Sequence, residues 1–143
     1  MRSWAEINLD NLRHNINILK TIAGDSMLLP AIKADAYGHG IAEVFNVLIS
    51  EGIKWVGVAT FNEAEKLRKL DKATNILVFG PVETEDMRKA IDMNIAFPLT
   101  SMDEIDFLNE NNLAPRVHLA VDTGMGRIGF SRNSLDEVKR KTE

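Results

Sequence analysis

Apolar residues gather in short runs along the chain, and the segments between these runs are mostly polar. The runs read LLPAIK (28–33), WVGVAT (55–60), NILVFG (75–80), NIAFPL (94–99) and RVHLAV (116–121). Short runs that are apolar nearly throughout are typical of strands buried on both faces of a parallel sheet. The pattern therefore predicts five strands.

The intervening segments place apolar side chains three or four residues apart, which aligns them along one face of a helix. An early helix is indicated by Asp10 as an N-cap, and Thr100 or Ser101 can cap a later helix in the same way. The apolar positions that define these helices are Leu12, Ile16 and Leu19; Ile41, Val44, Phe45 and Leu48; Ala64, Leu67 and Leu70; Met87, Ala90 and Ile91; Met102, Ile105 and Leu108.

Strands that alternate with helices predict an α/β fold with a parallel sheet covered by helices. Two architectures satisfy this pattern, a doubly wound open sheet and a (β/α)8 TIM barrel. A complete barrel takes about 250 residues, so a chain of 143 residues holds about five of its eight strands. The chain also stops within the polar, helix-like segment 134–143. We expect residues 1–143 to be the N-terminal part of a longer protein.

Composition narrows the functional classes. The chain has no cysteine, which excludes disulfides, cysteine-based zinc sites and thiol nucleophiles. Its net charge of −4 argues against a broad nucleic-acid footprint, which needs clustered positive charge. No segment resembles a signal peptide or reaches the length of a membrane span. His14 and His118 have no ligand partner at metal spacing. We expect a cytoplasmic protein without metal, nucleic-acid or membrane partners.

Candidate chemistry follows the first run, where residues 31–40 read AIKADAYGHG. Lys33 interrupts an apolar strand at its carboxyl end, where α/β folds place their ligands. A lysine in that position can form a Schiff base with a carbonyl, although a solvated strand-end lysine would show the same pattern. Tyr37 can donate its hydroxyl to a phosphate or pack as an ordinary aromatic. Gly38 and Gly40 permit tight backbone geometry ahead of the next helix, where free amides favour anions.

A second candidate site follows the fifth run, where residues 122–130 read DTGMGRIGF. Gly124, Gly126 and Gly129 match the dinucleotide-binding spacing G-x-G-x-x-G, but no helix follows directly, as that site requires. Asp-Thr-Gly is also the active loop of aspartic proteases, whose all-β fold contradicts the alternation seen here. Arg127 lies among the glycines, where its guanidinium can bind an anionic oxygen bidentately or simply face solvent.

Four blocks together resemble bacterial alanine racemase, in the order of that family: 4–15 (WAEINLDNLRHN), 31–40, 55–68 (WVGVATFNEAEKLR) and 121–130 (VDTGMGRIGF). The resemblance implies an isomerase that converts L-alanine to D-alanine for peptidoglycan precursors, using pyridoxal 5'-phosphate and two-base α-proton transfer. It also implies an N-terminal (β/α)8 barrel, a C-terminal β domain that lies outside this chain, and a head-to-tail homodimer acting on a small amino acid.

The resemblance assigns roles to three residues. Lys33 carries the cofactor and serves as one of two α-proton bases, Tyr37 contacts the cofactor phosphate, and Arg127 binds near the cofactor's phenolic oxygen and the substrate carboxylate. The second base of the family is a tyrosine from the partner subunit, whereas the only tyrosine here is Tyr37. Many family members carry a lysine, often carbamylated, at the position of Ala120, so Arg127 must be oriented by other means.

Two alternatives remain open at this stage. A pyridoxal phosphate carrier or homeostasis barrel shares the cofactor lysine but needs no second catalytic domain. A racemase of another amino acid, such as serine, shares the whole mechanism. We expect the 143 residues alone not to be a fully active racemase, because the second base and part of the substrate pocket fall outside them, and we expect such a part to self-associate.

Overall fold

The computed structural model describes residues 4–142. The elements are α1 (Leu9–Ala23), α2 (Lys33–Gly38), α3 (Ile41–Ser50), β1 (Trp55–Val58), α4 (Phe61–Leu70), β2 (Asn75–Val78), α5 (Thr84–Asp92), β3 (Ile95–Leu99), α6 (Met102–Glu110), β4 (Val117–Leu119), the 3₁₀ turn η1 (Arg132–Ser134) and α7 (Leu135–Thr142). From α3 to β4 helices and strands alternate as the sequence predicts, whereas α1, α2 and α3 follow one another without a named strand between them.

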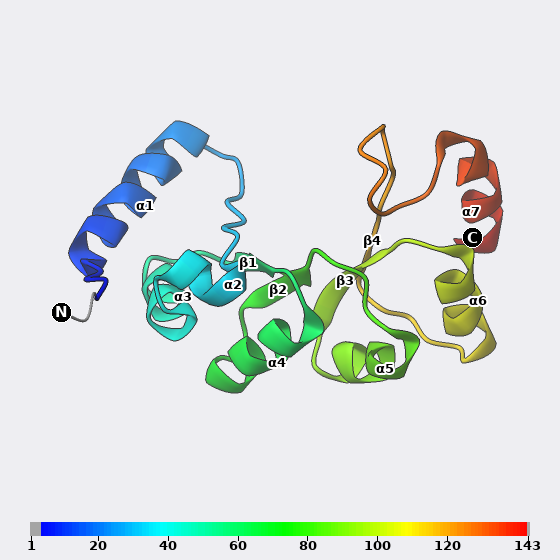
Figure 1. Ribbon diagram of the computed structural model, residues 1–143, viewed down its shortest axis with the longest axis horizontal. Coiled ribbons are helices and arrows are strands. Elements are labelled where there is room, and N and C mark those ends of the chain that lie inside the picture. The colour runs from blue at the N-terminus through cyan, green and yellow to red at the C-terminus, as the bar shows by residue number, and fades with distance from the viewer. Residues whose placement is uncertain (1–3, 143) are drawn as a thin grey trace.

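The four strands pair in parallel in the order β1-β2-β3-β4. Each new strand therefore adds beside the previous one, without the reversal of order that a doubly wound sheet contains. This order is that of a barrel wall. Figure 1 shows α3, α4 and α5 along one side of the sheet, while the segment after β4 rises on the other side. The fold is thus part of a TIM barrel.

The first of the five expected strands is much shorter than the sequence predicts. In place of a strand over residues 28–33, Ala31 alone pairs with Gly57, in a parallel bridge. The amide of Ile32 donates to the carbonyl of Gly57 at 2.8 Å, and the amide of Gly57 donates to Pro30 at 2.8 Å. Pro30 has no N–H to extend this ladder, and α2 begins at Lys33, so pairing stops after one bridge.

The core lies between the sheet and its helices. Val56 and Val58 of β1 are fully buried beside Ile76 and Val78 of β2, and α4 packs on both strands. The alternate residues of these strands face the other side of the sheet, where Leu77 is only half-buried. One face of the sheet is therefore closed by helices. On the opposite face Gly57 and Ala96, which are aligned with Leu77 in the parallel ladder, are buried.

Capping side chains set where the helices begin. Ser101 caps α6 as expected, in a capping box with Glu104, and Thr60 and Glu63 form the same box at α4. The N-cap predicted at Asp10 is wrong, because α1 begins two residues earlier, where the Asn8 side chain accepts from the amide of Asn11 at 2.9 Å. Asp10 lies in the first turn, where its negative charge interacts favourably with the positive end of the helix dipole.

Arg68 of α4 ties together the ends at which two strands begin. The side chain is buried, and its guanidinium donates to the carbonyls of Asp71, Thr74, Met93 and Asn94 at 2.8–3.2 Å. Residues 71–74 lead into β2, and residues 93–94 lead into β3. Burial lowers the pKa of Arg68 from its ordinary value, and the hydrogen bonds compensate for the desolvated charge.

We predict that Arg68→Met destabilises the fold by about 3–5 kcal/mol, because four carbonyls lose their donor while the apolar stem stays in place. The free energy of unfolding from urea titration measures this change. Lys66→Met is the matched control, since Lys66 is exposed on the same helix and its replacement should change stability by less than about 0.5 kcal/mol. Equal effects of the two substitutions would contradict the role given to Arg68.

Candidate active site

A cavity of about 320 Å³ lies where the parallel strands end. It is lined by Lys33, Ala59, Phe79, Gly80, Pro81, Arg127 and Ile128. Ala59 directly follows β1, and Phe79 to Pro81 directly follow β2. Active sites of α/β barrels lie at this carboxyl-terminal face, because the loops after successive strands converge there. The location predicted for Lys33 and Arg127 is therefore where a cavity forms.

Lys33 is followed by a turn of unusual handedness. Ala34, Asp35, Ala36 and Tyr37 all have positive φ, between 51° and 55°, with ψ between 37° and 53°. Left-handed geometry costs a residue with a Cβ about 1–2 kcal/mol, so four in succession hold considerable strain. Such strain persists only where surrounding contacts determine the backbone, and it clusters at functional sites.

Two carboxylates fix this turn from outside and from within. Glu63 of α4 accepts from the amide of Ala34 at 2.7 Å, and Asp35 accepts from the amide of Ile41, which begins α3, at 2.8 Å. The turn is therefore attached to the helices on both sides of it. The glycines at 38 and 40, with φ of 85° and 86°, complete the connection to α3.

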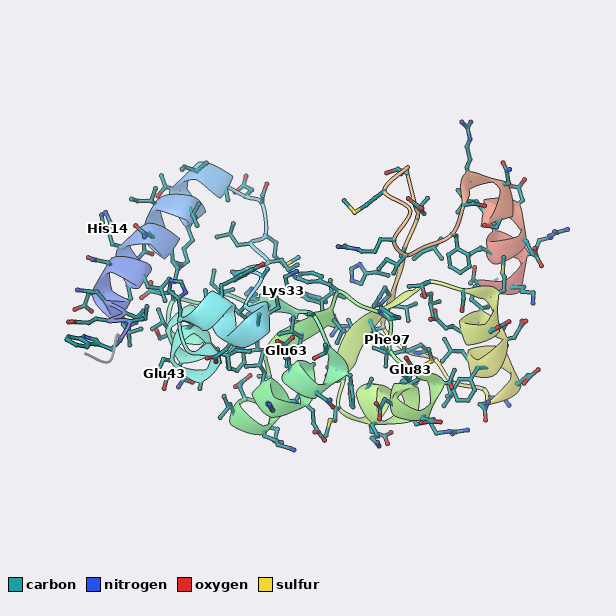
Figure 2. All side chains as sticks on the ribbon, viewed as in Figure 1. His14, Lys33, Glu43, Glu63, Glu83 and Phe97 are labelled. Carbon is teal, nitrogen blue, oxygen red and sulfur yellow. The ribbon has the colours of Figure 1, made fainter. Side chains whose placement is uncertain are left out.

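Lys33 and Arg127 give the cavity its charge. Lys33 is half-buried at the edge of the sheet, with Glu63 nearby on α4 (Figure 2). Within residues 4–142 neither the Lys33 amine nor the Arg127 guanidinium has a hydrogen-bond or ion-pair partner, and no acidic side chain lines the cavity. Two unpaired cations on one partly apolar cavity attract an anionic ligand such as a carboxylate or a phosphate.

The loop that carries Arg127 is closed by its own backbone and by one carboxylate. Asp122 accepts from the amides of Gly124 and Gly126 at 2.9 and 3.0 Å. The amide of Asp122 donates to Phe130 at 2.9 Å, and the amide of Phe130 donates to Ala120 at 2.8 Å. With an alanine at position 120, these contacts are what shape the loop around Arg127.

Two glycines, Gly57 and Gly80, allow the residues beside the cavity to pack closely. A Cβ at Gly57 would lie 2.0 Å from the Phe79 ring, so the ring occupies the space that a side chain would need. A Cβ at Gly80 would lie 2.7 Å from the carbonyl oxygen of Ala59. Both glycines therefore permit close packing at the ends of β1 and β2.

The sequence was also compared with protein families and with known proteins. The family model described as "Alanine racemase, N-terminal domain" matches residues 7–143. The chain belongs to the alanine racemase family. It is 36% identical to the alanine racemase of Fusobacterium nucleatum over 138 residues, which cover 96% of this chain and 39% of that protein. It is 39% identical to the enzyme of Clostridium kluyveri, covering 94% of this chain and 36% of the relative.

Solved structures of racemases are similar to this chain as well. The structure of alanine racemase from Corynebacterium glutamicum matches with a TM-score of 0.88 and 33% identity, over 95% of this chain and 40% of the other. Histidine racemase from Leuconostoc mesenteroides matches with a TM-score of 0.82 and 28% identity, over 93% of this chain and 37% of the other. The chain spans between a third and two fifths of the length of the relatives named here.

The structure brings together two of the three site residues that the family resemblance implies. Lys33 and Arg127 line one cavity, whereas Tyr37 does not line it and is 61% exposed. Sequence reasoning missed Phe79, Gly80 and Pro81, although the strand pattern 75–80 places them at a carboxyl end. It also missed Glu63, whose capping-box spacing with Thr60 is visible in the sequence.

The competing readings of the glycine segment do not fit the fold. After Phe130 the chain continues through η1 before α7 begins at Leu135, so no helix N-terminus follows the glycines directly. The parallel sheet also excludes the all-β fold of aspartic proteases. In the described part of the chain no three His, Cys, Asp or Glu side chains cluster to hold a metal ion. None of the helices over residues 4–142 is long and apolar enough to cross a membrane.

We predict that Gly57→Ala destabilises the fold by about 1–3 kcal/mol, because the new methyl group collides with the Phe79 ring. Phe79→Ala removes that ring, so the double variant should be less destabilised than the sum of the single variants by about 1 kcal/mol or more. Urea titration of the four proteins measures this coupling. Additive effects would show that the Phe79 ring moves aside freely.

The loop around Arg127 should respond to acid through Asp122. The amides of Gly126 and Gly124 lower the pKa of Asp122 below its ordinary value. A lowered folded-state pKa means that the ordering is complete above about pH 4 and is lost as the pH falls through the folded value. The amide chemical shifts of Gly124 and Gly126 should therefore stay constant from neutral pH to about 4 and then move together. Asp122→Asn should abolish this common step.

Proposed function

We propose that this chain forms the cofactor-lysine part of a pyridoxal 5'-phosphate-dependent alanine racemase. The observation that carries the proposal is that Lys33 and Arg127 line one cavity at the carboxyl ends of the strands. The donor set fits the cofactor and its substrate. An unpaired, half-buried amine can condense with an aldehyde, and a second cation can bind a carboxylate or an oxyanion. A volume of about 320 Å³ is within the range of small-molecule sites.

The chemistry divides between the cofactor and the protein. When bound, pyridoxal phosphate supplies a conjugated ring that withdraws electrons from the Cα–H bond of the amino acid. The Lys33 amine would hold the cofactor, and as a free amine it would take or return the α-proton on one face of the substrate. Arg127 would bind the substrate carboxylate and the cofactor's phenolic oxygen, and would so fix the face of the substrate that meets Lys33. Tyr37, whose side chain is exposed and does not line the cavity, would hold the cofactor phosphate.

Inversion requires a second proton donor on the opposite face. No other amine, imidazole or phenol lines the cavity within residues 4–142. We therefore assign the second base to residues outside this part of the chain, from a C-terminal β domain of a partner subunit in a head-to-tail homodimer. In this proposal residues 1–143 are the N-terminal part of the barrel. The complete enzyme supplies D-alanine for peptidoglycan in the cytoplasm.

A racemase of another amino acid is a second candidate. The observation that favours it is the match to histidine racemase, which has the same fold over 93% of this chain. Because that enzyme and the alanine racemases share this part of the barrel, the described residues do not select one side chain over another. The site accordingly recognises the α-amino and α-carboxyl groups common to all these substrates.

Covalent trapping tests the assignment of Lys33. The protein is mixed with pyridoxal phosphate, reduced with borohydride and mapped by mass spectrometry, and we expect the modification at Lys33. Lys33→Arg keeps the charge but removes the reactive amine, so it should abolish the label. Arg127→Met should weaken the concentration dependence of trapping about tenfold or more, since a charge-assisted contact is lost.

Two further results would decide between the candidate functions. Label at a lysine other than Lys33 would reject the proposed site. Racemisation assays with L-alanine, L-serine and L-histidine distinguish the substrate classes. Substantial turnover by the 143 residues alone would contradict the assignment of the second base to another segment.

A further inference from the structure

Glu63 connects the helix after β1 to the turn after Lys33. One carboxylate oxygen, Oε2, accepts from the amides of Ala59 and Thr60 at 2.8 and 3.2 Å, which is the capping-box role. The other oxygen, Oε1, accepts from the amide of Ala34 at 2.7 Å. A single carboxylate therefore binds three backbone amides, two directly after β1 and one in the turn after the Ala31–Gly57 bridge.

The left-handed part of the backbone begins at Ala34. Ala34 is the first of the four left-handed residues, and it directly follows Lys33. The amide of Ala34 belongs to the peptide bond that joins it to Lys33, so the hydrogen bond to Glu63 holds the backbone directly beside the Lys33 Cα. Because left-handed geometry is unfavourable for alanine, the turn needs an external contact at this point, and Glu63 supplies a charged acceptor to it.

Glu104 shows that capping alone does not require such a link. It forms the same box with Ser101 at α6, and its carboxylate accepts from the amides of Thr100 and Ser101 and from the hydroxyl of Thr100. All of these partners belong to its own strand–helix junction. The second oxygen distinguishes the two residues: Oε1 of Glu104 accepts from the hydroxyl of Thr100 at its own helix, whereas Oε1 of Glu63 accepts from the amide of Ala34 in the neighbouring turn.

We propose that Glu63 is a positioning residue for Lys33, one that fixes the left-handed turn and so aims the amine into the cavity. The catalytic meaning of this role rests on the proposed function, whereas the positioning itself does not. The Glu63 carboxylate acts through the Ala34 amide. It does not line the cavity.

Three variants of the 143-residue chain test this role. Glu63→Gln leaves one carbonyl oxygen to accept from either Ala34 or the amides of Ala59 and Thr60. Glu63→Asp keeps the negative charge at the N-terminus of α4, but its side chain is too short to reach both groups of amides. Glu104→Gln is the matched control, with the same loss to a capping box. Hydrogen exchange of the peptide that contains Ala34 reports the hydrogen bond. Competitive acetylation reports the Lys33 amine, with exposed Lys66 of α4 as internal reference.

We expect both Glu63 variants to speed exchange at Ala34 about tenfold or more, as for a lost bond to a charged acceptor. The ratio of Lys33 to Lys66 acetylation should rise at least severalfold, while borohydride trapping of pyridoxal phosphate at Lys33 falls. A rise in acetylation together with a fall in pyridoxal phosphate trapping indicates that the Lys33 amine no longer points into the cavity. A general increase in the mobility of the chain would raise both reactions. Glu104→Gln should leave all three readouts at wild-type values.

The proposal is overturned if the Glu63 variants keep the wild-type acetylation ratio, or if Glu104→Gln shifts it equally. Should Glu63→Gln lose its helical circular dichroism, Glu63→Asp decides the question, because it keeps an acidic residue in the first turn of α4. The proposed function fails separately. If wild-type protein is trapped at another lysine, Lys33 is not the cofactor residue, and the acetylation ratio still tests its positioning.

Discussion

Parallel pairing in chain order is the constraint on which the site depends. Because β1 to β4 follow one another across the sheet, every strand ends at the same edge, and every loop after a strand reaches that edge. Lys33 and Arg127 belong to distant parts of the sequence, yet they meet because each follows a chain segment paired into the same sheet. An antiparallel pairing of any strand would have sent its loop to the opposite end.

The two ends of the sheet have different energetic roles. At the end where strands begin, Arg68 is buried and its guanidinium is satisfied by four carbonyls. At the end where strands finish, two cations have no partner in the described chain and four residues adopt left-handed geometry. The arrangement around Arg68 stabilises the fold, whereas the two cations at the other end remain available to bind an anionic ligand. This division is typical of barrel enzymes, in which stability and chemistry lie on opposite faces.

Most of the fold follows from local sequence patterns. The four named strands and the cap at Ser101 arise where hydrophobic period and capping chemistry agree. The apolar pattern predicts a longer first strand than the chain forms, because the apolar residues of 28–33 outweigh one proline in the pattern, whereas Pro30 stops the ladder of hydrogen bonds. Asp10 and Asn8 are equally good capping residues by type, so the sequence does not distinguish them, and only the course of the backbone makes Asn8 the cap of α1.

The site was less predictable than the fold. The glycines at 38 and 40 indicated tight geometry, but Ala34, Asp35, Ala36 and Tyr37 have little intrinsic preference for left-handed conformation, and nothing local predicts a run of it. The conformation depends on contacts from elsewhere in the chain, above all from Glu63 and from Asp35 to the start of α3. Tyr37 is carried outward by the same turn, to 61% exposure.

The geometry of the cavity also bears on the symmetry of the proposed reaction. Racemisation passes through a planar carbon, so protons must be exchanged on two opposite faces. In the proposed reaction Lys33 is the base that the cavity supplies, and the other charged residue among the described lining residues, Arg127, is assigned to the substrate carboxylate. The second base of the proposed reaction therefore has to be a group that is not among the described residues lining this cavity. Lys33, at one edge of the parallel sheet, thus exchanges the proton on one face of the substrate in the proposed reaction, and a separate element has to exchange it on the other face.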